Sequence, residues 1–266
     1  MIKAYWWQGG PGKGNFGDQL TRRLCERLSG QRVEFAEPHR ADILAIGSIL
    51  DPHFWQPGSW QQYRGFIWGT GRMFGRLPME FPLARVLAVR GRLSRSRLGC
   101  CNNPAVLLGD PGLLCPLFAR PTSKRYKLGI VPHWSETRHP LLGHLAAKSP
   151  EIKLIDMCGS VEEVLDGLGA CQNILASALH GLVAADALGI PNEWLRLNTG
   201  NENRVGMPEF KYRDYYSVYG LEDKKYLTLG PDDTLESILG RFGDYARPGL
   251  SSLQQTLIDA FPFRRG

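Results

Sequence analysis

Short apolar runs that alternate with amphipathic segments constrain the fold of this chain most. Nearly continuous apolar runs that end in Gly, Ser or Arg occur at 41–50, 65–71 and 85–91. Such runs are typical of strands that are buried on both faces of a parallel sheet. Ahead of them, the segment 18–29 repeats leucine at helical spacing, and this helix is expected to end at Gly30. This alternation predicts an α/β fold.

The same pattern continues along the chain and divides it in two. Further strands are expected at 2–7, 105–114, 127–134, 152–158, 192–197 and the start of 173–181. Further helices are expected at 139–149, 160–171, 231–242 and 249–261. Ser160 and Glu163 have the spacing of a capping box at the start of the second of these. The polar segment 119–127 is the best candidate for a linker. We predict two α/β domains that face each other across a cleft, at 1–120 and 121–230, with helices at 231–266 that pack back on the first domain.

Several polar residues lie at expected strand ends, beyond which open α/β sheets bind their ligands. They are Arg90, Asp110, His133, Ser177 and His180, together with the glycine-containing segments 9–18, 47–48 and 69–71. The segment 9–18 has the letters GxGxxG but no P-loop lysine. A dinucleotide site, an anion at a helix N-terminus and a plain turn all stay open. Asp18 stands where the N-cap of the next helix is expected. His180 is either a proton-transfer group or a packed histidine.

The positive charge of the chain is local. The 266 residues carry a net charge of +6. Five arginines with no acid among them fall within 85–97: Arg85, Arg90, Arg92, Arg95 and Arg97. Such a segment either binds nucleic acid, an anionic membrane or an anionic small molecule, or is simply exposed to solvent. No nucleic-acid-binding motif, CxxC metal pair or hydrolase signature accompanies it.

Membrane spans and export signals are not expected. No run approaches 18 consecutive apolar residues, and the N-terminus lacks the apolar core of a secretory signal. We therefore expect a cytoplasmic protein whose six cysteines are reduced.

Eight segments agree in order and spacing with one known family. They are NFGDQL (15–20), DILAIGSIL (42–50), FIWGTG (66–71), VLAVRGRLS (86–94), GDPGLL (109–114), VPHW (131–134), SALHGLVAADALGIP (177–191) and FKYRDYYSVYGL (210–221). Together they resemble the polysaccharide pyruvyl transferase family, and within it the exopolysaccharide ketal-pyruvate transferases of the xanthan and succinoglycan type. The resemblance covers about residues 5–221.

The resemblance implies a fold and a reaction. The fold is two Rossmann-like domains arranged as in GT-B glycosyltransferases, with the acceptor bound mainly by the first domain and the donor by the second. The reaction transfers pyruvate from phosphoenolpyruvate to a sugar as a ketal. Because phosphoenolpyruvate is a co-substrate, no cofactor or metal is expected.

Roles for single residues follow from the same resemblance. Arg90 and Lys211 would grip the phosphate and carboxylate of the donor. His180 would be the general acid and base, and Asp18 would activate the acceptor hydroxyl. Further substrate-binding residues are expected at Asn15, His133, Ser177 and Gly181.

The partners implied are phosphoenolpyruvate and a carbohydrate acceptor, with no nucleic acid. A polyprenyl-diphosphate-linked oligosaccharide as acceptor would bring the enzyme to the inner membrane face, which a basic surface favours. Two other functions stay open from the residues. One is a GT-B-like glycosyltransferase that uses a nucleotide sugar, and the other is a non-catalytic polyanion-binding protein.

Overall fold

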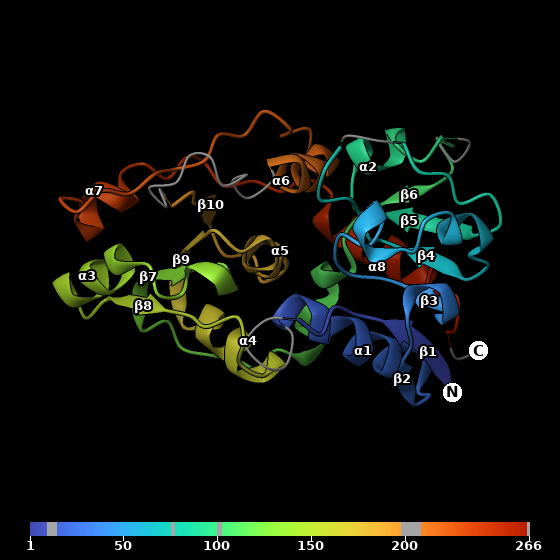
Figure 1. The fold of residues 1–266 in the computed structure, drawn as a ribbon. Coiled ribbons are helices and arrows are strands. Elements are labelled where there is room, and N and C mark those ends of the chain that lie inside the picture. Colours follow the sequence, from blue (N-terminus) through green and yellow to red (C-terminus); the bar gives the residue numbers. More distant parts are fainter. Residues whose placement is uncertain (10–14, 76–77, 100–102, 198–208, 265–266) are drawn as a thin grey trace.

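Two parallel sheets form the centre of the fold (Figure 1). A computed structural model describes residues 1–9, 15–75, 78–99, 103–197 and 209–264. One sheet has six strands in the order β2-β1-β3-β4-β5-β6, and the other has four in the order β10-β9-β7-β8. All strand pairings in the described part are parallel. The predicted α/β class is therefore confirmed.

The strands of the first sheet are mostly shorter than the apolar runs that predict them. They are β1 (Ile2–Tyr5), β2 (Val33–Phe35), β3 (Ile43–Leu44), β4 (Phe66–Trp68), β5 (Arg85–Val89) and β6 (Leu107–Leu108). The run 41–50 yields the two residues of β3, and Gly47 beyond it has a φ of 111°. Glycine alone takes up this conformation readily, so the chain can turn here at the carboxyl end of the sheet.

The second sheet contains the strands expected for the second half of the chain. They are β7 (Tyr126–Val131), β8 (Ile152–Leu154), β9 (Cys171–Ala176) and β10 (Asn192–Trp194). The strand β7 pairs with both β8 and β9. The chain reaches it from the first sheet through residues 119–125, which are neither helix nor strand.

Helices connect these strands and cover the sheets (Figure 1). The α-helices are α1 (Phe16–Ser29), α2 (Arg92–Ser96), α3 (Pro140–Lys148), α4 (Val161–Gly169), α5 (Leu179–Ala187), α6 (Glu209–Tyr216), α7 (Leu235–Leu239) and α8 (Leu250–Asp259). Short 3-10 helices are η1 (Pro38–Arg40), η2 (Pro52–Phe54), η3 (Ser59–Gln62), η5 (Pro111–Phe118), η6 (Trp134–Glu136) and η7 (Ser217–Tyr219). Neither β2 nor α6 is predicted by the sequence patterns.

The start of α1 differs from the sequence prediction in its cap. Asn15, not Asp18, caps the helix, because the Asn15 side chain accepts hydrogen bonds from the N–H groups of Gly17 and Asp18. Asp18 lies in the first helical turn. The predicted helix end at Gly30 is confirmed by its left-handed φ of 64°.

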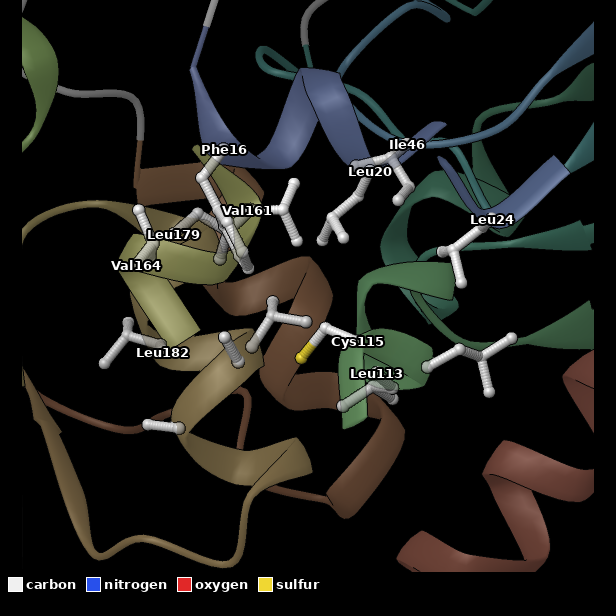
Figure 2. Close-up of a cluster of buried hydrophobic side chains, with 14 of the residues drawn as sticks. Phe16, Leu20, Leu24, Ile46, Leu113, Cys115, Val161, Val164, Leu179 and Leu182 are labelled. Atoms are coloured by element: carbon white, nitrogen blue, oxygen red, sulfur yellow. The ribbon is translucent and has the colours of Figure 1, made fainter. Parts of the chain in front are cut away.

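One buried apolar cluster contains side chains from both halves of the chain (Figure 2). It forms where α1, α4, α5 and η5 meet. The labelled members are Phe16, Leu20, Leu24, Ile46, Leu113, Cys115, Val161, Val164, Leu179 and Leu182. Since these side chains pack on one another, the first turns of α1 and α5 are held close together.

The last helix, α8, packs beside the first sheet. The Trp68 indole on β4 donates a hydrogen bond of 3.0 Å to the carbonyl of Leu257, and its ring lies 4.9 Å from that of Phe261. No helix within the described ranges is both long and apolar enough to cross a membrane.

Candidate functional site

A pocket of about 360 Å³ lies at the carboxyl ends of strands from both sheets. That volume is within the usual range for small-molecule sites. Its polar lining residues are Asn15, Asp18, Ser48, His53, His133, His180 and Lys211. Its larger apolar lining residues are Trp7, Ile49, Phe54, Met73, Trp134 and Met157. The pocket therefore combines titratable groups with aromatic rings.

Five of the eight residues predicted for the site line this pocket. They are Asn15, Asp18, His133, His180 and Lys211. Of the described residues, Arg90, Ser177 and Gly181 are not among those that line it. The first and last of these five residues, Asn15 and Lys211, are more than 190 positions apart in sequence.

Asp18 is a buried carboxyl group in the first turn of α1. It is 6% exposed and accepts hydrogen bonds from the backbone N–H groups of Trp7 and Asn15. Burial raises its pKa to about 7, although His180 and those hydrogen bonds act in the opposite direction. A carboxyl group with this pKa can both give and take a proton near neutral pH.

His180 lies at the start of α5, between Asp110 and Gly17. Its Nε2 is 3.7 Å from Oδ2 of Asp110. Both atoms are buried and neither has a hydrogen-bond partner in the part of the chain that the structure describes. Asp110 is fixed at the start of η5, where its other oxygen accepts the N–H of Gly112 at 2.8 Å. A small movement of the imidazole would therefore complete a hydrogen bond between the two side chains.

On the side opposite Asp110, the His180 ring lies against Gly17, which has no side chain there. A Cβ atom at Gly17 would lie 2.0 Å from Nδ1 of His180. No side-chain atom tolerates such a distance, so a glycine at this position permits the imidazole to lie against the first turn of α1.

His133 follows β7 and lies half-buried at the pocket. Its Nδ1 is 2.7 Å from Oγ of Ser135. Burial lowers the pKa of His133 to about 3, with smaller contributions from Lys211 and His180. His133 is therefore neutral at physiological pH and can accept or donate a hydrogen bond without adding charge.

Lys211 brings an ammonium group from α6 to the pocket. It is 6% exposed, and burial lowers its pKa to about 8, assisted by Arg90 and opposed by Glu136 and Asp18. Below that pH the group is a cation, so an anion in the pocket would meet a positive charge in a largely desolvated setting.

Arg90 lies behind the pocket. It is 0% exposed, and its Nε donates to Asp214 on α6 at 3.0 Å. Its Nη1 donates to Ser48 Oγ at 3.1 Å and to the Gly47 carbonyl at 3.4 Å, and its Nη2 donates to the Arg72 carbonyl. The guanidinium is thus directed into the protein and holds two segments that themselves line the pocket.

Ser177 and Gly181 support the pocket through packing and hydrogen bonds. Ser177 Oγ accepts the N–H of His133 at 3.0 Å and donates to Glu136. Its carbonyl accepts the hydroxyl of Tyr212 at 2.5 Å. At Gly181, a Cβ would lie 2.8 Å from Cγ1 of Val131, so the glycine allows α5 to pack closely on β7.

The arginine-rich segment does not form one basic patch. Arg90 is buried, Arg92 donates to the Ser217 carbonyl at 2.8 Å, and Arg95 donates to the Val106 carbonyl at 3.3 Å. Arg85 and Arg97 are exposed. The segment therefore contributes one internal cation, two arginines bound to backbone carbonyls and two solvated charges.

Part of the Gly-rich segment lies outside the described residues, including Gly12, Lys13 and Gly14 of the GxGxxG letters. Cys100 and Cys101 also lie outside them, while Cys25, Cys115, Cys158 and Cys171 are free thiols. Within the described ranges, no cluster of three His, Cys, Asp or Glu side chains could hold a metal ion.

The aromatic side of the pocket was not predicted from sequence. Trp7 and Trp134 lie with ring centroids 5.5 Å apart, and Phe54 and the exposed His53 also line the pocket. The sequence does show several tryptophans in its first part, but this clustering does not indicate which of them lines a pocket.

The fold and the pocket define an α/β protein with a pocket that combines titratable and aromatic side chains. Comparison with known proteins gives the family. The chain belongs to the polysaccharide pyruvyl transferase family, a family of transferases, whose model matches residues 81–192. That range contains Arg90, Asp110, His133 and His180 but neither Asp18 nor Lys211.

Two curated relatives are similar over most of the chain. Uncharacterized protein L143 of Acanthamoeba polyphaga mimivirus is 31% identical over 230 residues, which cover 81% of this chain and 75% of the relative. Succinoglycan biosynthesis protein ExoV of Rhizobium meliloti (strain 1021) is 27% identical over 228 residues, which cover 83% of this chain and 66% of ExoV. No solved structure matches the chain significantly.

Removing the Arg90 side chain should destabilise the protein strongly. We expect Arg90→Met to cost about 3–5 kcal/mol in the free energy of unfolding, because Asp214 is left buried without its cation. Urea denaturation measures this. The matched control is Arg22→Met, which removes an exposed ion pair with Glu26 and should change stability by less than about 0.5 kcal/mol. An equally small effect of R90M would contradict the structural role of the pair.

Asp18 should make the protein less stable as the pH rises. Its folded pKa of about 7 exceeds the ordinary value of about 3.9, so folding takes up a proton between these pH values. Its contribution to stability is complete below pH ~4 and is lost as the pH rises through 7. Asp18→Asn should therefore gain stability over the wild type, on the order of a few kcal/mol, between pH 5 and pH 8.

Urea unfolding of both proteins across this pH range measures the difference. Glu163→Gln is the control: hydrogen bonds from Ser160 lower the pKa of Glu163, so this residue stays ionised across the range and its effect on stability should hardly change with pH. A stability difference between D18N and the wild type that does not change with pH would contradict the raised pKa.

Proposed function

We propose that this protein transfers the pyruvyl group of phosphoenolpyruvate to a sugar of an exopolysaccharide or of its lipid-linked precursor, with release of phosphate. The observation that carries this proposal is one pocket in which Lys211 lies with the protonatable side chains Asp18 and His180. The family and the similarity to ExoV, which by its name acts in succinoglycan biosynthesis, support it.

The donor is a small anion, and the pocket has suitable partners for it. Lys211 supplies a cation for the phosphate or carboxylate. The first turns of α1 and α5 begin at the pocket, at Asn15 and Ala178. The positive ends of two helix dipoles therefore add to the attraction for an anion.

Proton transfer is the chemical requirement of the reaction. A proton is added to the methylene carbon of phosphoenolpyruvate, which leaves an oxocarbenium-like centre at C2. One sugar hydroxyl forms a C–O bond to C2, the bond from C2 to the phosphate oxygen breaks, and a second hydroxyl closes the ring. Of the two protons released by the hydroxyls, one balances the proton taken up by carbon and the other leaves with phosphate.

His180 and Asp18 are the groups for these transfers. We assign His180 as the general acid and base beside the donor, and Asp18 as the base that accepts a proton from the attacking hydroxyl. A pKa of about 7 allows Asp18 to exchange protons near neutral pH. His180 acts electrostatically on Asp18 and lowers the pKa of that carboxyl group, against the larger effect of burial.

Arg90 has a positioning role in this proposal. Its bonds to Ser48 and to Asp214 hold two walls of the pocket. It therefore acts on the donor through Ser48 and through α6, which carries Lys211, while its own guanidinium is committed to the protein.

We also propose that the two sheets belong to two Rossmann-like domains that face a cleft in the manner of GT-B enzymes. The proposed domains are 1–120 and 121–230, with the helices of 231–266 following. Support comes from the parallel strand order of each sheet and from lining residues that both sheets contribute to one pocket.

Replacing His180 by Ala should lower kcat by about 10²–10⁴-fold, while binding of phosphoenolpyruvate changes little because Lys211 remains. Phosphate release and the mass of a pyruvylated glycan report turnover, and thermal stabilisation by phosphoenolpyruvate reports binding. Arg97→Ala is the control, since Arg97 is exposed and does not line the pocket. Wild-type turnover by H180A would remove His180 from proton transfer. Stabilisation by nucleotide sugars but not by phosphoenolpyruvate would contradict the proposed donor.

Asp110→Asn tests whether Asp110 orients the His180 ring. We expect a kcat between those of the wild type and H180A, with KM for phosphoenolpyruvate unchanged, because Asp110 contacts His180 and does not line the pocket. The optimum of the pH–rate profile should also shift, which a loss of stability alone does not cause. An equal loss in KM and kcat, with an unshifted profile, would contradict the positioning role.

A further inference from the structure

We propose that Trp7 and Trp134, together with Phe54 and His53, form the subsite that binds the pyranose ring of the acceptor. This inference rests on the proposed function and adds the side chains that recognise the sugar. Five of the seven tryptophans lie within the first 68 residues, and the proposed acid–base chemistry uses none of the seven.

The structure sorts these tryptophans by their surroundings. Trp55 and Trp68 are buried, and their indole N–H groups donate to the carbonyls of Ile49 and Leu257. Trp6 packs against Phe35 with centroids 5.3 Å apart. Trp60 packs on the core of the first half. These four have structural partners and, unlike Trp7, do not line the pocket.

Trp7 and Trp134 form a pair across the two halves of the chain. Trp7 follows β1 and Trp134 follows β7. Their rings lie 5.5 Å apart at an interplanar angle of 36°, and both are half-buried. An aromatic pair that lines a pocket and remains partly open to it offers apolar surface to a ligand at little cost in side-chain entropy.

A second aromatic pair that lines the pocket comes from η2. His53 and Phe54 have ring centroids 4.0 Å apart, and Phe54 rests on Tyr5 at 6.1 Å. His53 is exposed, so this part of the lining reaches the surface of the molecule. A sugar that remains attached to a longer oligosaccharide needs such an open side.

The two substrates differ in chemistry, and each suits a different group of residues in the pocket. Phosphoenolpyruvate is a compact anion, which suits the side of Lys211, Asp18 and His180. A pyranose is neutral, with hydroxyl groups at its edge and C–H groups on its faces, which suits aromatic rings. The ring of His133 lies 5.3 Å from that of Trp134. Its low pKa keeps it neutral there, and it can exchange hydrogen bonds with sugar hydroxyls.

The test uses the full chain and three probe sugars: methyl β-glucopyranoside, methyl β-galactopyranoside and cellotetraose. Saturation-transfer NMR in the presence of phosphoenolpyruvate detects which sugar protons contact the protein. For at least one probe we expect the strongest transfer at the ring C–H protons. Trp134→Ala and Trp7→Ala should weaken binding of that probe about 10-fold, and Trp134→Phe should weaken it less because an aromatic ring is retained.

Trp60→Ala is the matched control, since it truncates a half-buried indole that does not line the pocket. It should leave sugar binding unchanged. Thermal stabilisation by phosphoenolpyruvate should be the same in all variants, which shows that each is folded with an intact donor side.

Two results would overturn the subsite. One is that no probe sugar receives saturation from the wild-type protein. The other is that W7A and W134A bind the probe as tightly as the wild type does. The proposed function fails in a different way, namely when a bound sugar and phosphoenolpyruvate yield no phosphate and no pyruvylated product.

Discussion

The buried ion pair between Arg90 and Asp214 is the interaction on which the geometry of the site depends. It joins the end of β5 to α6, two segments 124 residues apart in sequence. Asp214 also accepts hydrogen bonds from the N–H and hydroxyl of Ser94, so both charges are satisfied within the protein. Because α6 carries Lys211, the position of the pocket's ammonium group is set by a bond that lies outside the pocket.

A second constraint acts on the acid–base groups. Phe16 and Leu20 on α1 and Leu179 and Leu182 on α5 enter one apolar cluster (Figure 2). Asp18 and His180 lie on the same two helices, and both side chains line the pocket. Burial of apolar surface therefore determines where the polar groups meet, and the raised pKa of Asp18 follows from this enclosure.

Local features of the fold are readable from the sequence. Continuous apolar runs predict the buried strands. The helix end at Gly30 and the capping box of Ser160 and Glu163 are found as expected, because each depends on residues close together in the chain. The helix α6 escapes prediction because charged residues lie on its buried side. Lys211 and Asp214 are buried beside Tyr212, so polar and apolar residues do not separate onto two faces of the helix.

Contacts between distant segments account for the rest. The sequence places Arg90 at a strand end but does not reveal that its partner is Asp214. It likewise predicts His180 and Asp18 for one site, whereas the place of Asp110 beside His180 depends on the packing of η5 against α5. The pairing of Trp7 with Trp134 arises only when the two sheets are assembled, since no local pattern links residues so far apart.

Because Gly17 has no side chain, the residue at this position is coupled to the residue at 180, far away in the sequence. Any larger residue at 17 would occupy the space of the imidazole at 180, so the two positions cannot vary independently. Substitution at 17 can be accommodated only by a smaller side chain at 180, and the histidine would then be lost. Within this fold, a histidine at 180 therefore requires a glycine at 17, whereas a glycine at 17 is compatible with other small residues at 180.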